Sequence, residues 1–511
     1  MSNPHLVTNA AADSPEVQAL KRELVWAHLK IQALEEQLRL QRIAKYGPAS
    51  ETLSNLQLDL LEGEPGVSSA EVQAEAGRDQ NLDAKPKRTR RPHPGRQELP
   101  KDLPRVERVI AVKAEECACK ACGEATTVIG YDESEQLDVE PARYFVLVTK
   151  REKRACRHCT EGGVKTAPVA ARILDKSLVS DRVIVDTVIG KYCDHLPLYR
   201  QSAILERETG VEISRATMDG WVMRAGELLV PVAEAMKRNL VSGTYIQADE
   251  TPVDVQVRDG SGHNHQAYLW QYGKPGGETV FDFRMGRGGE GPRTFLGQYE
   301  GILQTDGYVV YDRVGGVRIV HAGCWAHSRR KFVEAVKLNS QDETAAGIIL
   351  RINEIFHVDA LARERGFTHE QRHELRQEKT APQLPALKEE LKRVAATVLP
   401  ASALGKAVNY TILQWTKLNR FLEHPELELS NNLAENSMRG VALGRKNWIH
   451  VGSEKAGPKV AAILSVIESC RRLGVSAREY LANVLPGLAD ASIQRMPQLT
   501  PLAWKSSRAN G

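Results

Sequence analysis

The sequence predicts a multidomain α+β protein, and three observations lead to this fold class. A heptad of apolar residues near the start predicts an N-terminal coiled coil over residues 15–45. Two Cys-x-x-Cys pairs predict a zinc-ribbon-like unit over residues 105–168. Later in the chain a strand-rich stretch lies between long amphipathic segments, which indicates an α/β core surrounded by helices. With 511 residues the chain is too long for one ordinary core, so several domains are expected.

The composition excludes several classes of protein. The formal net charge of +4 is small for this length, so any nucleic-acid surface has to arise from local clusters of Lys and Arg. The chain has no apolar run of about 18 residues, and its polar start lacks the apolar core of a signal peptide. Eight cysteines are too few for a disulfide scaffold of this size. We therefore expect a cytoplasmic protein with no membrane partner.

The apolar seam of the predicted coiled coil repeats every seven residues. Its positions alternate at spacings of three and four: Val17, Leu20, Leu24, Ala27, Ile31, Leu34 and Leu38. Charged residues occupy positions between them, which is typical of helices that pair with a second copy of the same chain. The alternative is a single amphipathic helix packed on its own domain. The heptad favours self-association as a homodimer or a higher homo-oligomer.

Residues 62–100 form the predicted linker. Its first part is rich in Glu, Gly, Ser, Gln and Ala and has no periodicity, which is typical of a disordered segment. The linker continues into KPKRTRRPHPGR, which holds six basic residues and no acid. Such a strip can follow the phosphate backbone of DNA, and the alternative is a solvated basic linker. The candidate DNA contacts in it are Lys87, Arg88, Arg90 and Arg91.

Two cysteine pairs define the candidate zinc site of the unit at residues 105–168. Its four candidate ligands are Cys119, Cys122, Cys156 and Cys159. Each pair can supply two thiolates from one tight turn, and four thiolates suit a tetrahedral Zn²⁺ ion. The ion would be structural because four protein ligands leave no open position, although Cys117 could compete as a ligand. The segment YFVLVTKREKRA at residues 144–155 alternates like a strand, as in a zinc ribbon.

Residues 175–240 carry the pattern of a helix-turn-helix DNA-binding domain. One helical stretch ends at Gly210 as a predicted C-cap, and the next begins after Ser214 as a predicted N-cap. The second helix would reach a major groove with its first turn. The residues expected there are Arg215, Thr217 and Met218. The alternative is an ordinary helical hairpin, which shows the same pattern.

The strand-rich stretch at residues 241–338 shows the strand order of a ribonuclease-H-like sheet. Three runs joined by short turns predict an antiparallel meander: TYIQADETPVDVQV, AYLWQYG and TVFDFR. A short helix, two more strands and a longer helix then follow: GPRTFLGQYEG, ILQTDGYVVY, VRIVHAG and CWAHSRRKFVEAV. In this topology the first and fourth strands are neighbours in the sheet. Asp249 and Asp306 would therefore come together, each at the end of its strand.

The two aspartates form a candidate Mg²⁺ site. Two close carboxylates repel each other unless a cation lies between them, which favours a bound metal ion. The alternative for each aspartate alone is a turn or cap position at a strand end. A helical insertion is predicted over residues 339–428, and the last part of the core, with the C-terminal helices, over residues 429–495.

Glu435 is the candidate for a third metal ligand. It lies early in a predicted helix that begins at Ser430 or Asn431, and a helix packed on the sheet can direct its carboxylate toward the two aspartates. Its rivals lie in a short acidic loop: Glu423, Glu426 and Glu428. Three basic residues near Glu435 can offset the charge of DNA phosphates: Arg439, Arg445 and Lys446.

Eight segments spread over nearly the whole chain carry a resemblance to a known family. They are KYGPASE, GRQELPKDLPR, SEQLDVEPARYFV, ADETPV, LQTDGYVVYD, GCWAHSRRKF, NNLAENSMR and GRKNWIHVGSEKAG. Together they resemble the catalytic subunit of the bacterial insertion-sequence sixty-six family of DDE transposases. The resemblance implies a retroviral-integrase-like core in which Asp249, Asp306 and Glu435 are the catalytic triad and hold two Mg²⁺ or Mn²⁺ ions. It also implies binding of terminal inverted repeats, cleavage of 3′ ends and strand transfer.

The resemblance further implies partners and supporting residues. The partners are double-stranded DNA, at the transposon ends and at the target, and small accessory proteins encoded by the same element, with the protein associated with the nucleoid. Cys324 and His327 are expected to support the active site. Three basic residues beside them are expected to face DNA: Arg329, Arg330 and Lys331. Together with His321 the pair is spaced like metal ligands, but three residues without a fourth ligand disfavour a zinc ion there.

Three other functions compete with this interpretation. The first is a domesticated or inactive transposase that acts as a DNA-binding regulator, which the intact set of three acids disfavours. The second is a metal-dependent nuclease or Holliday-junction resolvase on the same fold. Such enzymes commonly lack both a long helical insertion and a separate end-recognition module. The third is a zinc-organised scaffold that recruits partners, which leaves the three acids unexplained.

Overall fold

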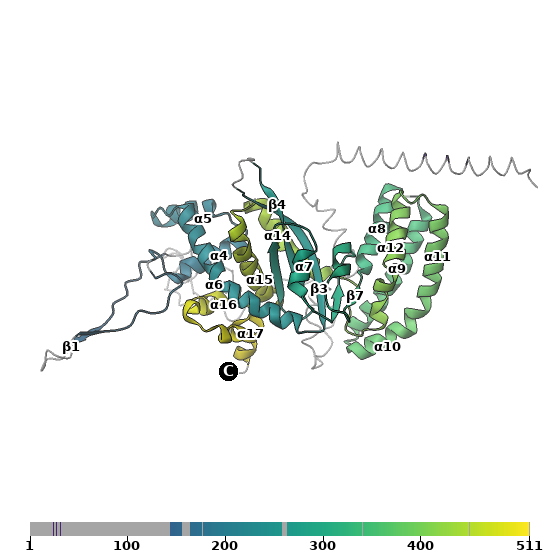
Figure 1. Ribbon diagram of the computed structural model, residues 1–511. Coiled ribbons are helices and arrows are strands. Elements are labelled where there is room, and N and C mark those ends of the chain that lie inside the picture. Colours follow the sequence, from purple (N-terminus) through teal and green to yellow (C-terminus); the bar gives the residue numbers. More distant parts are fainter. Residues whose placement is uncertain are drawn as a thin grey trace, which may run out of the picture. The chain divides into compact units, whose positions relative to one another are not determined.

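The computed structural model describes most of the chain after residue 143 (Figure 1). The described residues are 144–155, 164–175, 177–257, 263–339, 341–448 and 450–509, with the single positions Leu24, Ala27 and Ile31. Outside them lie the candidate zinc ligands and the basic linker residues: Cys119, Cys122, Cys156, Cys159, Lys87, Arg88, Arg90 and Arg91. The helices and strands below belong to the compact unit of residues 1–82 and 151–511, and residues 83–150 form a second unit.

A six-stranded mixed sheet lies at the centre of the larger unit. Five strands follow the order β5-β4-β3-β6-β7, and the sixth, β8, pairs with β3. Their bounds are β3 Tyr245–Val255, β4 His265–Gly273, β5 Thr279–Arg284, β6 Ile302–Gln304, β7 Val320–Ala322 and β8 His450–Val451. The first three pair antiparallel, whereas β6 and β8 pair parallel with β3 and β7 pairs parallel with β6. This confirms the predicted meander and the prediction that its first strand and the fourth strand, β3 and β6, are neighbours.

The burial pattern of β3 changes along its length. Residues 245–248 are all buried, as expected of a central strand that is covered on both faces. Toward its end the strand alternates, with Val253 and Val255 buried and Asp254 exposed between them. The change falls at Asp249, which is half-buried. The sequence pattern thus brings a polar residue to the point where β3 emerges from full burial.

Helices that precede and follow the sheet build the main hydrophobic core with it. Their bounds are α4 Asp181–Tyr192, α5 Leu198–Thr209, α6 Arg215–Val241, α14 Asn432–Trp448, α15 Gly457–Leu473, α16 Ala477–Val484 and α17 Pro501–Ala509. α15 packs along α6 and against β5, while α14 packs on β3 and β4. Gly226 permits the close approach of α6 to α15, since a Cβ there would lie 2.8 Å from the carbonyl oxygen of Lys459.

A second set of helices follows β7 and packs as a bundle (Figure 1). Their bounds are α8 Trp325–Leu338, α9 Glu343–Glu364, α10 His369–Lys379, α11 Leu384–Thr397, α12 Ala403–Leu413 and α13 Trp415–Leu418. The bundle has its own hydrophobic core, in which Trp325, Phe332, Ile352 and Val408 are fully buried. The insertion between the second and third acids is therefore helical, as predicted.

Shorter elements connect these layers. They are α7 Glu290–Leu296, η3 Val309–Arg313, η4 Ala381–Gln383, η5 Arg420–Leu422, η6 Glu454–Ala456, η7 Leu488–Asp490 and η8 Ile493–Leu499, where η denotes a 3₁₀ helix. Among the described residues, no helix combines the length and the apolar character needed to span a membrane.

The strand predicted over residues 144–155 is largely wrong. Residues 144–152 have no regular secondary structure, and only β1, Lys153–Ala155, is a strand, which pairs antiparallel with β2, Val164–Thr166. The apolar side chains from Tyr144 to Val148 are exposed. Alternation predicts a strand only where one face can be buried, and this segment buries neither face.

Candidate metal centre

The register of β3 and β6 brings Asp249 and Asp306 to neighbouring positions. The two strands pair in parallel, and their last paired residues are Gln247 and Gln304. Each aspartate lies two residues beyond that pair on its own chain segment. Because both strands run in the same direction, both side chains emerge at the same edge of the paired stretch. The charge of Asp306 accordingly acts on Asp249.

The prediction that both aspartates lie at strand ends is nearly right for Asp306, which lies two residues beyond its strand. It is wrong for Asp249, which lies inside its strand. β6 ends at Gln304, whereas β3 continues to Val255. The longer strand persists because β4 pairs with β3 as far as Val255, and β8 joins its far end. Asp249 therefore lies on a rigid strand interior rather than on a strand end.

Asp306 is oriented by its own turn and by the helical insertion. Its Oδ1 atom accepts a hydrogen bond from the backbone N–H of Tyr308, 2.9 Å away. Its backbone carbonyl accepts a hydrogen bond from the hydroxyl of Tyr410 on α12. Gly307, with φ of 89°, makes the sharp turn between Asp306 and Tyr308 in a conformation that side-chain-bearing residues rarely adopt. The Asp-Gly-Tyr sequence thus positions the carboxylate locally.

Glu435 projects from the first turn of α14. The carbonyl of Asn431 accepts hydrogen bonds from the N–H groups of Ala434 and Glu435 at 2.9 and 3.2 Å, which starts the helix at this point. Glu435 Oε1 lies 3.4 Å from His327 Nδ1, and Oε2 lies 3.2 Å from Arg330 Nη2. The helix start agrees with the predicted one, and it places the acid one turn into the helix.

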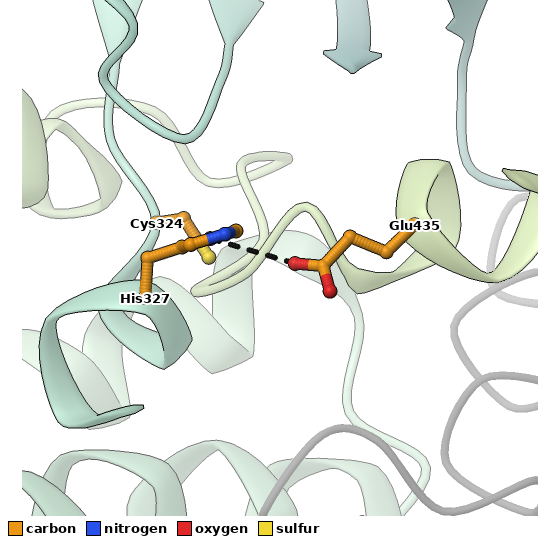
Figure 2. A group of neighbouring side chains, drawn as sticks. All are labelled: Cys324, His327 and Glu435. Atoms are coloured by element: carbon orange, nitrogen blue, oxygen red, sulfur yellow. Dashed lines mark ion pairs between the residues drawn. The ribbon is translucent and has the colours of Figure 1, made fainter. Parts of the chain in front are cut away.

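Cys324, His327 and Glu435 converge at this point (Figure 2). Their closest ligand atoms all lie within 4.8 Å of one another. Cys324 is fully buried and directly precedes α8, so that His327 follows it on the first turn of that helix. The cysteine and histidine thus lie beside Glu435, whereas His321 is not part of this group.

The charges around Asp249 favour a bound cation. Burial raises the pKa of Asp249 well above its ordinary value, and the nearby carboxylates of Glu435, Glu250 and Asp306 raise it further, against the opposing effect of His327. Burial lowers the pKa of His327, but Cys324 and Glu435 outweigh this and bring it to about 10. A half-buried carboxylate beside several other acids is a poor site for an isolated negative charge and a good one for a divalent cation. The oxygen donors fit Mg²⁺ or Mn²⁺, whereas the thiol and imidazole beside them are softer donors.

Glu250 is a buried acid of this region that sequence reasoning missed. Its Oε1 accepts hydrogen bonds from Arg287 Nε and Nη2 at 3.1 and 2.8 Å, and its Oε2 accepts one from the hydroxyl of Tyr311 at 2.9 Å. Both oxygens are therefore occupied by protein donors. Glu250 directly follows Asp249 in the strand, and adjacent strand residues point to opposite faces, so strand alternation predicts that only one of the two acids faces the metal site.

Two of the three acidic-loop rivals of Glu435 bind other partners. Glu428 is buried and accepts a hydrogen bond from Arg372 at 2.8 Å, and Glu423 pairs with Arg420. Among the four candidate acids, Glu435 is the one whose charge raises the pKa of Asp249. Of these acids, Glu435 acts on Asp249, whereas the Glu428 carboxylate binds Arg372 of the helical insertion.

The basic residues predicted to contact DNA differ in how far protein groups already hold them. Arg330 pairs with Glu435, and Arg445 Nη1 donates to Thr251 Oγ1 at 3.0 Å and to the carbonyl of Pro252 at 2.7 Å. Arg445 is half-buried because it ties α14 to β3. The other predicted contacts divide by exposure. Arg329 and Lys331 are half-buried, with Arg329 Nε 2.7 Å from Asn353 Oδ1 and Lys331 Nζ 4.7 Å from the centre of the Tyr410 ring; Arg439 and Lys446 are exposed.

The predicted helix-turn-helix has both of its caps. Gly210 ends α5 with φ of 68°, and Ser214 Oγ accepts the N–H of Thr217 at 3.1 Å at the start of α6. Arg215 and Thr217 are exposed on this first turn. Met218 is 2% exposed, so the prediction that it reaches a groove is wrong. Its side chain belongs to the apolar face that α6 buries in the main core.

Three family models match this chain. The model described as Transposase IS66 family matches residues 176–459, which include Asp249, Asp306 and Glu435. The model described as zinc-finger binding domain of transposase IS66 matches residues 116–160, which include the four candidate zinc ligands. The model described as Transposase C of IS166 homeodomain matches residues 33–108.

Several proteins of Sinorhizobium fredii (strain NBRC 101917 / NGR234) are similar over most of the chain. Uncharacterized protein y4qI is 32% identical over 499 residues, which cover 94% of this chain and 90% of that protein. Uncharacterized protein y4jD is 33% identical over 428 residues, which cover 80% and 82% of the two chains. Uncharacterized protein y4hP is 29% identical over 510 residues, which cover 95% and 90%. Because the first family model spans more than half of the sequence and these relatives span most of it, the chain belongs to the IS66 family of transposases.

Proposed function

We propose that the chain is a DDE transposase that binds the terminal inverted repeats of its insertion sequence, cleaves the 3′ ends and joins them to target DNA. The observation that carries this proposal is the approach of three acids from separate elements. Asp249 comes from β3, Asp306 from the turn after β6, and Glu435 from α14. The sheet order, with three antiparallel strands followed by two parallel ones, supports a ribonuclease-H-like core.

The three acids would hold two Mg²⁺ or Mn²⁺ ions. When bound, such ions activate water or a 3′-hydroxyl for in-line attack on a phosphodiester and stabilise the leaving oxygen. The protein's part is to hold the ligands in place. The Tyr308 N–H and the Tyr410 hydroxyl orient the turn that carries Asp306, and Arg330 neutralises the charge of Glu435. The strands β3 and β6 and the helix α14 are rigid supports. This suits a metal centre, whose ligands have to stay within about 0.5 Å of their required positions.

A structural Zn²⁺ ion would be held by the cysteine pairs. The match of residues 116–160 to a zinc-finger model supports this assignment for Cys119, Cys122, Cys156 and Cys159. The second pair falls in sequence between β1 and β2, which pair as a short antiparallel hairpin. In the sequence, a cysteine pair flanked by two short paired strands is typical of a zinc ribbon.

Recognition of DNA would involve several surfaces. Arg215 and Thr217 at the start of α6 suit a major groove, and the exposed Arg439 and Lys446 of α14 suit the phosphates near the metal centre. In the basic linker the candidates are Lys87, Arg88, Arg90 and Arg91. Self-association through the heptad would bring two ends together, and the seam positions Leu24 and Ile31 are exposed in a single chain. Small accessory proteins of the same element are further candidate partners.

The experiment is a cleavage and strand-transfer assay on DNA that carries the ends of the element encoding this chain, with Mg²⁺ or Mn²⁺. Asp249→Asn, Asp306→Asn and Glu435→Gln should bind the ends and fail to cut. Glu426→Gln, in the acidic loop, is the matched control and should cut like the wild type. A wild type that binds the ends but never cuts, even with accessory proteins, would assign the chain to the regulator class. Normal cutting by Glu435→Gln would instead move the third ligand to the acidic loop.

A further inference from the structure

A short buried segment, residues 428–431, leads into α14 and is held from two sides. We propose that a clamp positions Glu435 against Asp249 and Asp306. It comprises Gln247 and Gln304 on the sheet side and Arg363 and Arg372 on the insertion side, which together hold Glu428 and Ser430. This inference rests on the proposed function of the three acids, and it assigns the insertion a direct part in building the metal centre.

The sheet side of the clamp is a column of polar residues beneath the metal centre. On β3, Tyr245, Gln247 and Asp249 are alternate residues and therefore share one face of the strand. Gln247 lies directly opposite Gln304 of β6. The two glutamines are 1% and 0% exposed, so each must find its hydrogen-bond partners inside the protein. They form the layer immediately before the two aspartates.

The two amides bind the backbone of the segment that precedes α14. Gln247 Nε2 donates to the carbonyl of Ser430 at 3.0 Å, and Gln304 Nε2 donates to the carbonyl of Glu428 at 2.7 Å. Gln304 Nε2 also donates to the carbonyl of Gly323 at 3.0 Å, directly before Cys324. The Tyr245 hydroxyl donates to Gln304 Oε1 at 2.5 Å, which fixes the orientation of that amide. One side-chain layer thus connects both strands to the starts of α14 and α8.

The same segment is joined to the strand at the level of the metal centre. Asn431 Nδ2 lies 3.5 Å from the carbonyl of Ala248, the residue before Asp249. The carbonyl of Asn431 then starts α14 and accepts the N–H of Glu435. The carbonyl of Leu429 accepts the N–H of Trp325, the first residue of α8, at 2.9 Å. Only a few residues separate the clamped segment 428–431 from Glu435. The position of the segment therefore determines the position of Glu435.

The insertion side of the clamp holds the side chain of Glu428. Its carboxylate is 1% exposed and accepts a hydrogen bond from Arg372 of α10 at 2.8 Å, with Arg363 of α9 at 3.4 Å. Arg372 also donates to the carbonyl of Pro425 at 2.7 Å. The backbone of Glu428 is thus held by the sheet and its side chain by the insertion. Movement of α9 and α10 would pass directly to the start of α14.

Hydrogen bonds suit this task better than apolar contacts would. Apolar surfaces can slide past one another at little cost, whereas a buried carbonyl that loses its donor is strongly disfavoured, so the register of the segment is retained. A metal centre built from separate elements needs such a register, because ligand positions have to hold to within about 0.5 Å. The clamp fixes this register at Gln247 and Gln304, two residues before each aspartate, and at residues 428–431, a few residues before Glu435.

The test uses the full chain with Gln247→Met, Gln304→Met and Glu428→Gln, which keep side-chain volume and remove the amides or the charge. We expect amide exchange in the first turn of α14 to rise at least tenfold. The Mg²⁺ concentration for half-maximal cleavage should rise at least tenfold as well, with cleavage recovered at high Mg²⁺. Glu435→Gln should not recover. Ser469→Ala is the matched control, since it removes buried hydrogen bonds between α15 and Thr279 of β5.

Several outcomes would overturn the clamp. Unchanged exchange at α14 in the glutamine variants would show that the amides do not hold the segment. Faster exchange with an unchanged Mg²⁺ requirement would show a structural role without positioning. Equal effects in Ser469→Ala would trace both changes to global stability. If the methionine variants do not fold, Glu428→Gln carries the same two readouts. A wild type that does not cleave would contradict the proposed function, while the exchange measurement still decides whether the clamp holds Glu435.

Discussion

Glu435 of α14 and His327 of α8 face each other, with 3.4 Å between Oε1 and Nδ1 (Figure 2). The histidine borders the third acid from the side opposite α14 and belongs to the first element of the helical bundle. A residue that orients a metal ligand affects metal affinity without itself binding the metal. Under the proposed function, this relationship would make the helical bundle a participant in the metal centre, and it leads to the first prediction.

Replacing His327 by Ala should raise the Mg²⁺ requirement of cleavage. Loss of a group that orients a ligand typically costs about 10- to 100-fold in metal affinity or activity. His327→Asn is the matched control, because its amide can place a donor near the position of Nδ1 and should retain more activity. Mg²⁺ titration of cleavage distinguishes the two variants. Equal behaviour of Ala and Asn would show that His327 acts only by filling space.

The stability of the protein in chelator should fall as pH rises, and Mg²⁺ should reverse this. Burial and neighbouring acids raise the pKa of Asp249 above its ordinary value of 3.8, so the folded state holds more protons than the unfolded state above that pH. The free energy of unfolding therefore decreases from about pH 4 upward until Asp249 is ionised. Urea unfolding at several pH values, with EDTA or Mg²⁺, measures the slope. Asp249→Asn should flatten it, and an unchanged slope in that variant would refute the assignment.

Tyr311→Phe should destabilise the fold near the second aspartate. Tyr311 is 1% exposed, and its hydroxyl donates to the buried Glu250 Oε2 at 2.9 Å. Without this hydroxyl, the buried Oε2 of Glu250 loses a hydrogen-bond donor, which lowers the free energy of unfolding by about 1–3 kcal/mol. Tyr268→Phe is the matched control, since its hydroxyl bonds the exposed Gln266 and should change the unfolding free energy by less than about 0.5 kcal/mol. Equal effects of the two substitutions in urea unfolding would argue against the buried contact.

Arg215→Ala should weaken binding to the element's ends. Arg215 is exposed at the start of α6, and a base or phosphate contact there contributes about 1–3 kcal/mol or about one unit of salt slope. Arg207→Ala on α5 is the control, because that side chain is exposed and pairs with Glu208. Binding measured over a range of salt concentrations separates the two. Equal losses for both variants would indicate a general charge effect rather than a contact of α6.

Arg376→Met should destabilise the helical bundle strongly. Arg376 Nε and Nη2 each lie 2.7 Å from a carboxylate oxygen of Asp359, and both residues are nearly unexposed. Removing the arginine leaves a buried charge without this partner, which costs about 3–5 kcal/mol. Arg351→Met breaks a half-exposed pair with Glu390 and should cost less than about 1 kcal/mol. Thermal unfolding compares them, and a similar shift in both would contradict the role of burial.

Residue type and spacing predicted the local elements and their order. Alternating runs predicted β3, β4 and β5, and the Gly210 and Ser214 caps bound the turn between α5 and α6 as expected. From the order of strands it followed that β3 and β6 would be neighbours. These features depend on backbone conformation and on the burial of one face, and residue type and spacing predict both.

The directions of the side chains at the site could be known only from the packed fold. It showed that Asp249 lies inside β3, that Met218 is buried, and that Arg330 and Arg445 bind protein groups. It also revealed Glu250 with its own partners and the amide layer that holds the segment before α14. The physical reason is that the direction of a side chain depends on which elements pack around it, and those elements are far apart in the sequence. Local patterns specify each helix and strand, but the contacts between them specify the site.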